Sequence, residues 1–130
     1  MTLLCYIICE SAVDVKGNSM KVAVIGSRGL QVNDLQNYLP EDTDEIVSGG
    51  AYGIDTCAEE YAKENGIPFT KIRPNYDEHG RQAPILRNVE IATYADTVLA
   101  FWDGKSKGTR FVIEYCRKHE IPVKIFVANT

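Results

Sequence analysis

The feature that most constrains this chain is the alternation, from residue 21 onward, of short apolar runs with longer segments of helical periodicity. Lys21–Ile25 is almost continuously apolar, which is typical of a strand buried on both faces of a sheet. The further predicted strands are Glu45–Ser48, Phe69–Ile72, Thr97–Trp102 and Val123–Val127. Strands that alternate with helices favour a parallel sheet with right-handed crossovers. We therefore predict a Rossmann-like, doubly wound α/β fold in three layers, with strand order 3-2-1-4-5.

The segments between these strands predict the helical layers on both faces of the sheet. The predicted helices are Gln31–Tyr38, Gly53–Glu64, Ile85–Tyr94 and Thr109–His119. Arg73–Ala83 contains proline, asparagine, glycine and several charges, and it predicts a loop.

The first 19 residues differ from the alternating part, and two interpretations of them stay open. Lys16–Ser19 has the composition of a linker, and Met20 opens a clean strand, so residues 1–19 could be an N-terminal extension. Alternatively, Leu3–Cys9 is rich in strand-forming residues and could add an edge strand. Residues 20–130 then form a single Rossmann-like domain, as a chain of 130 residues predicts.

Composition and charge disfavour three classes of protein: nucleic-acid-binding, zinc-binding and membrane-spanning proteins. The net charge is −4, whereas proteins that bind nucleic acids usually carry a basic excess, so nucleic acid is disfavoured as a partner. The four cysteines form no Cys-x-x-Cys pair and no histidine cluster joins them, which disfavours zinc. No run approaches the ~20 apolar residues of a membrane span, and Leu3–Cys9 makes a poor signal peptide. We predict a cytoplasmic protein without a membrane partner.

Three glycine-rich loops follow predicted strands and form the candidate site. In an open parallel sheet, ligands bind beyond the carboxyl ends of the strands where strand order reverses, here between the first and fourth predicted strands. Small residues let backbone amides approach an anion, and the dipole of a following helix attracts it. The predicted ligand-binding residues of the three loops are Gly26, Ser27 and Arg28, then Ser48, Gly49, Gly50, Ala51, Gly53 and Asp55, then Trp102, Asp103, Gly104, Ser106, Lys107, Gly108 and Thr109.

Several of these residues also have purely structural interpretations. Asp55 could complement the dipole of its helix or accept a hydrogen bond from a ribose hydroxyl, and Thr109 could be an N-cap. Trp102 could stack on a base or belong to the core. Arg87 and Asn88 join the predicted phosphate-binding set because their side chains could point at the same pocket.

These loops, in this order, resemble the SLOG superfamily, a Rossmann-like group that contains the DprA/Smf proteins and the LOG phosphoribohydrolases. They are most similar to its small YspA-type, cpYpsA-related branch. The resemblance covers about residues 21–127 and is carried by Gly26-Ser27-Arg28, Ser48 to Asp55, His79-Gly80-Arg81 leading to Arg87-Asn88, and Ala95 to Thr109. It implies binding of a nucleotide or nucleotide-derived ligand, as a sensor or ligand-binding module, and a homo-oligomer of two or more copies.

Two other functions stay open as alternatives. Enzymatic LOG proteins have the signature Pro-Gly-Gly-x-Gly-Thr-x-x-Glu, but three residues after Thr109 this chain has Val112, and the nearest acid is Glu114. A nucleotide-processing hydrolase, which would cleave an N-glycosidic or phosphate bond, is the first alternative, with Glu114, Asp55 and Asp103 as candidate acids or bases. DprA-like binding of single-stranded DNA is the second. No residue pattern calls for a metal, although Mg²⁺ could accompany a bound phosphate.

Overall fold

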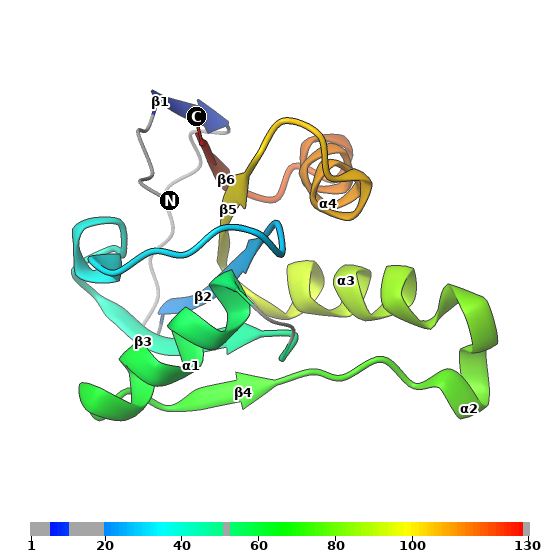
Figure 1. Ribbon diagram of the computed structural model, residues 1–130, viewed down its shortest axis with the longest axis horizontal. Coiled ribbons are helices and arrows are strands. Elements are labelled where there is room, and N and C mark those ends of the chain that lie inside the picture. Colours follow the sequence, from blue (N-terminus) through cyan, green and yellow to red (C-terminus); the bar gives the residue numbers. More distant parts are fainter. Residues whose placement is uncertain (1–5, 11–19, 51–52, 129–130) are drawn as a thin grey trace.

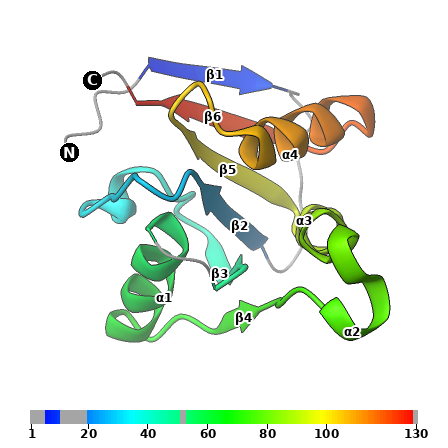
Figure 2. The same cartoon turned by 45° about the vertical axis from the view of Figure 1, so that its right-hand side comes forward.

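The computed structural model describes residues 6–10, 20–50 and 53–128. These residues form one sheet of six strands in the order β1-β6-β5-β2-β3-β4 (Figure 2). The strands are β1 (Tyr6–Glu10), β2 (Met20–Gly26), β3 (Thr43–Ser48), β4 (Phe69–Lys71), β5 (Thr97–Trp102) and β6 (Val123–Val127). The helices are α1 (Ile54–Glu64), α2 (Tyr76–His79), α3 (Ala83–Tyr94) and α4 (Lys107–Lys118), with short 3₁₀ helices η1 (Leu35–Asn37) and η2 (Gly80–Gln82).

Strands β2 to β6 pair with one another in parallel and confirm the predicted topology. β2 lies at the centre, paired with β3 on one side and β5 on the other, and β4 and β6 lie beyond them. In chain order this arrangement is 3-2-1-4-5. The additional strand β1 pairs antiparallel with β6, with Tyr6 opposite Val127 and Glu10 opposite Val123. The predicted linker Lys16–Ser19 lies outside the described residues.

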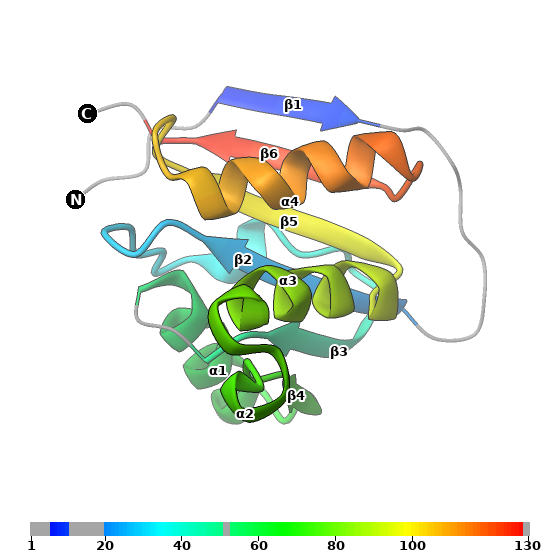
Figure 3. The same ribbon diagram turned by 90° about the vertical axis from the view of Figure 1, so that its right-hand side faces the viewer.

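Helices cover both faces of the sheet, as predicted. Because side chains alternate along a strand, Val22 and Val24 of β2 face one layer, with α1 and η1, whereas Ala23 and Ile25 face the other, with α3 and α4. Figures 1 and 3 show α3 and α4 together on one side of the sheet and α1 on the other. Val98, Leu99, Ala100 and Phe101 of β5 are all buried, which explains the continuous apolar run.

The prediction of a helix over Gln31–Tyr38 is wrong, because only the 3₁₀ turn η1 forms there. Leu30, Val32 and Leu35 are all buried against the α1 face of the sheet. Leu30 and Val32, on an irregular stretch before η1, are both buried although they are only two residues apart, whereas a helix through both would place them about 200° apart. The helical spacing of Val32 and Leu35 therefore extends over no more than the single turn η1.

The prediction of a loop over Arg73–Ala83 is also wrong, because this segment contains α2 and η2. The Asn75 side chain caps α2 by accepting a hydrogen bond from the Glu78 amide at 3.1 Å, and its amide group donates to Glu78 Oε1 at 3.2 Å. The first bond satisfies a free amide at the start of the helix, and the second joins the two side chains. Helix α3 then begins at Ala83, two residues before the predicted start, with Pro84 in its first turn.

Among the described residues, no helix is both long and apolar enough to cross a membrane. The cytoplasmic location stays a prediction.

Candidate functional site

A cavity of about 450 Å³ lies at the carboxyl ends of β2 and β5, where strand order reverses. Residues after both strands, the first turn of α1, and the facing sides of α3 and α4 surround it. The lining residues are Ile25, Gly26, Arg28, Gly29, Asp55, Pro84, Arg87, Asn88, Ile91, Asp103, Ser106, Gly108, Thr109 and Val112. The fold thus brings together residues that lie up to 87 positions apart (Ile25 to Val112) around one space.

Two arginines contribute the positive charge of this cavity. Arg28 is exposed in the loop after β2, whereas Arg87 is half-buried on α3. Arg87 Nε donates to Asn88 Oδ1 at 2.8 Å, and Nη1 donates to the Gly49 carbonyl at 3.0 Å. Burial lowers the pKa of the Arg87 guanidinium; the Asp55 carboxylate and Tyr76 oppose this shift, and the charge of Arg28 adds to it least. The charged form of Arg87 is therefore less stable here than it would be in water.

Gly49, the residue after β3, has no side chain, and this leaves room for the Arg87 guanidinium that bonds to its carbonyl. A Cβ atom on Gly49 would collide with Arg87 Nη1 and would lie 3.2 Å from Asp55 Oδ2. Gly49 therefore marks the point where the α3 arginine and the α1 carboxylate approach the same backbone. Asp55 itself is 7% exposed and lies in the first turn of α1, where the helix dipole favours a negative charge.

The loop between β5 and α4 is held by its own side chains. Asp103 Oδ1 accepts hydrogen bonds from the amides of Lys105 and Ser106, both at 2.8 Å, and these bonds lower the pKa of the Asp103 carboxyl. Ser27 Oγ accepts a bond from the Asp103 amide at 3.1 Å, which ties this loop to the one after β2. The loop is thus fixed beside the cavity before any ligand arrives.

Ser106, and not Thr109, is the N-cap of α4, so that interpretation of Thr109 is wrong. Ser106 Oγ accepts from the Thr109 amide at 3.3 Å, and the helix begins at Lys107, two residues before the predicted start. A serine N-cap can satisfy the amide three residues later, which the sequence Ser106 to Thr109 provides. Gly108 and Thr109, in the first turn, line the cavity.

Half of the predicted binding residues line the cavity, and the others lie around it. Those that line it are Gly26, Arg28, Asp55, Arg87, Asn88, Asp103, Ser106, Gly108 and Thr109. Those that do not are Ser27, Ser48, Gly49, Gly50, Gly53, Trp102, Gly104 and Lys107. Ala51 lies outside the described residues.

The outlying residues have structural contacts instead. Ser48 Oγ is buried and donates to the Val24 carbonyl at 2.7 Å. The Trp102 indole N–H donates to the Ser106 carbonyl at 3.0 Å, and its ring packs against the α3–α4 face of the core. Trp102 therefore follows the core interpretation and does not offer its ring to the cavity. Glu114, a predicted catalytic candidate, is exposed on α4 and also does not line the cavity.

Sequence reasoning missed the apolar part of the lining. These residues are Ile25, Pro84, Ile91 and Val112, together with Gly29. Ile91 follows Arg87 by four positions and Val112 follows Thr109 by three, so each shares a helix face with a predicted residue. Helical spacing from the predicted polar residues would have identified both.

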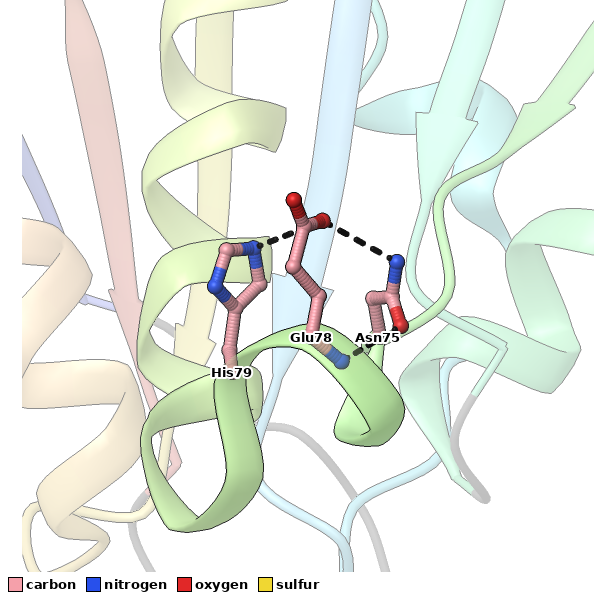
Figure 4. Close-up of polar contacts among 3 residues, drawn as sticks. All are labelled: Asn75, Glu78 and His79. Carbon is pink, nitrogen blue, oxygen red and sulfur yellow. Dashed lines mark hydrogen bonds and ion pairs between the residues drawn. The ribbon is translucent and has the colours of Figure 1, made fainter.

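A second cavity, of about 290 Å³, lies beyond the end of β4 and is also lined by Arg87. The other lining residues are Ile72, Arg73, Asn75, Glu78, His79, Ala83 and Glu90. Figure 4 shows Asn75, Glu78 and His79 gathered on α2, with His79 Nε2 3.5 Å from Glu78 Oε1. Within the described ranges, no group of three or more histidine, cysteine, aspartate or glutamate side chains could hold a metal ion.

Comparison with known proteins identifies a relative in a bacteriophage. The chain is 38% identical to the Gene 61 protein of Mycobacterium phage D29 over 84 residues, which make up 60% of this chain and 67% of the phage protein. The chain belongs to the same family as this Gene 61 protein. No family model matches the chain, and no solved structure matches it. The similarity to the Gene 61 protein does not test the resemblance to the SLOG superfamily, which stays a prediction.

Proposed function

We propose that the cavity between β2 and β5 binds the phosphate group of a nucleotide or nucleotide-derived ligand, and that the protein acts as a ligand-binding module or sensor. One observation carries this proposal: Arg28 and the half-buried Arg87 line the same cavity at the switch point of a parallel sheet. The chain has a net charge of −4 and the lining also contains Asp55 and Asp103, so the phosphate would be held by the two guanidinium groups and not by a general basic surface.

The electrostatics of Arg87 favour an anion beside it. Burial lowers the pKa of the Arg87 guanidinium, the charges of Asp55 and Tyr76 oppose this shift, and the charge of Arg28 adds the smallest contribution. A phosphate beside Arg87 would stabilise the charged guanidinium and accept charge-assisted hydrogen bonds from it. The first turn of α4, at Gly108 and Thr109, adds the positive end of a twelve-residue helix.

Hydrolysis of the bound ligand is the second candidate function, and the position of Asp55 favours it. Asp55 and Asp103 line the cavity, whereas Glu114 does not. If the ligand is cleaved, we expect Asp55 or Asp103 to act as acid or base, and Asp55 is the simpler one to test because Asp103 Oδ1 also holds its own loop through two amides. Membership of the SLOG superfamily, assembly into homo-oligomers and a cytoplasmic location are part of the same proposal.

Isothermal titration with the four ribonucleoside 5′-monophosphates tests the proposal. We expect saturable binding that Arg28→Ala and Arg87→Ala each weaken by about ten- to a hundredfold, since each removes charge-assisted hydrogen bonds. Arg117→Ala is the matched control, because it removes the same charge from the opposite end of α4. Equal affinity in the wild type and both cavity variants would contradict the proposed site.

The same samples distinguish a sensor from a hydrolase. Incubation followed by chromatography would show release of base or phosphate from the nucleotide. Turnover that is lost in Asp55→Asn, with binding retained, would favour the hydrolase. Binding without any product would favour the sensor.

A further inference from the structure

We infer that the second cavity, beside α2, is the subsite for the nucleoside part of the ligand whose phosphate occupies the first cavity. The inference rests on the proposed phosphate site and extends it along the edge of the sheet. It identifies the ligand class as a phosphate ester that carries a hydrogen-bond-donating sugar and base. The bound molecule would run from the ends of β5 and β2, past β3, to the end of β4.

The two cavities are neighbours that share one lining side chain. Arg87 lines both of them, and its Nη1 donates to the carbonyl of Gly49 at the end of β3. The Ile72 amide, in the lining of the second cavity, donates at 2.9 Å to the carbonyl of Ser48, the residue before Gly49. Arg87 and the backbone at Ser48 and Gly49 therefore connect the linings of the two cavities at the carboxyl edge of the sheet.

The separation of the strands sets the length of the ligand. Neighbouring strands lie about 4.8 Å apart, so β2 and β4, with β3 between them, are about 10 Å apart. An inorganic phosphate is too small to reach from one to the other, whereas a nucleoside monophosphate can cover that distance. The lining thus favours an extended ester over a bare anion.

The second cavity offers acceptors for a nucleoside. Like the first cavity it is lined by two arginines, here Arg73 and Arg87, and by two carboxylates, Glu78 and Glu90, which accept hydrogen bonds from hydroxyl and amine groups. The Asn75 amide and the His79 imidazole both lie at Glu78 Oε1, which fixes this carboxylate within the cavity (Figure 4). The Glu78 side chain is 68% exposed, so a ligand can reach it from solvent. Because the charges of Arg73 and Arg87 balance those of the two carboxylates, the site suits a neutral sugar and base that donate hydrogen bonds.

The test is the ratio of two affinities, one for adenosine 5′-monophosphate and one for inorganic phosphate. In the wild type we expect the nucleotide to bind at least tenfold more tightly. Glu78→Gln and Glu90→Gln should each reduce this ratio about three- to tenfold, since each converts a charged acceptor into a neutral one. Glu64→Gln removes the same charge at the end of α1, outside both cavities, and should leave the ratio unchanged.

The outcomes separate this inference from the proposed function. If phosphate and nucleotide bind equally, or if the ratio is the same in the wild type and both cavity variants, the second subsite is wrong while the phosphate site stands. If neither compound binds, both proposals fail. Inorganic phosphate that binds the Glu78→Gln protein as tightly as the wild type shows that the variant is folded and that its phosphate site is intact.

Discussion

The connections from β3 to α1 and from β5 to α4 both join a strand to a helix beside the same cavity, yet they are built differently. Gly53, before α1, has φ = 82°, and a Cβ atom there would lie 2.5 Å from the Arg28 carbonyl oxygen. Gly108, in the first turn of α4, has no neighbour within 4 Å of such a Cβ atom. The first connection depends on close backbone approach, whereas the second depends on the side chains of Asp103 and Ser106. Gly53 is therefore required by the close approach of another backbone segment, whereas Gly108 is not required by any neighbour of its Cα.

The largest effect should come from Gly53→Ala. The substitution places a side chain in a backbone region that is nearly restricted to glycine and against a fixed carbonyl, so we expect a loss of about 3 kcal/mol of unfolding free energy. Urea unfolding at neutral pH measures it. Gly66→Ala is the matched control, because Gly66 has φ = 66° but no neighbour within 4 Å of an added Cβ. It should cost about 1 kcal/mol, and equal losses in the two variants would show that backbone approach at Gly53 is unimportant.

Asp103→Ala should have the next largest effect, about 1–2 kcal/mol at pH 7, since two amides lose a charged acceptor. Hydrogen bonds lower the pKa of Asp103 in the folded state, so its contribution is complete above the ordinary carboxyl pKa and is lost as pH falls through the lowered folded value. The stability difference between wild type and variant should therefore shrink in unfolding experiments below about pH 4. A difference that grows on acidification would contradict the assignment of these bonds to the carboxylate.

Ser106→Ala should cost about 1 kcal/mol, because α4 loses the side chain that accepts from the Thr109 amide. Thermal or urea unfolding measures the loss. Ser106→Thr, which keeps a capping hydroxyl, should restore most of it. A full loss in the threonine variant would mean that the serine acts through packing and not through its cap.

The smallest effect, with the opposite sign, should come from Gly108→Ala. Alanine at an open position in the first turn of α4 should stabilise the protein by about 0.5 kcal/mol, through helix propensity and a less flexible unfolded chain. Parallel unfolding of Gly108→Ala and Gly53→Ala gives the contrast directly. If both Gly108→Ala and Gly53→Ala lower the free energy of unfolding, the β5–α4 connection depends on its glycine as the β3–α1 connection does, and the contrast is wrong.

The two connections also show what the sequence can predict. Strands β5 and β6 were predicted to the residue, because each is an apolar run bounded by polar or proline residues. The three loops were found because glycines follow strands. The bond from Arg87 to the Gly49 carbonyl joins residues 38 positions apart, and no local pattern reveals it. The sequence pattern does not reveal helix α2, because proline and asparagine before it and glycine after it predict a loop, whereas Asn75 with Glu78 is a helix start.

Trp102 gives the protein an intrinsic fluorophore at the edge of the proposed site. It is the single tryptophan of the chain, so its emission reports on one place. The indole N–H is bonded to the carbonyl of Ser106, a residue that lines the first cavity, and the Arg110 guanidinium lies 5.7 Å from the ring centroid. A ligand that shifts the β5–α4 loop changes the polarity around this indole, so an unlabelled sample can signal its own occupancy in a fluorimeter.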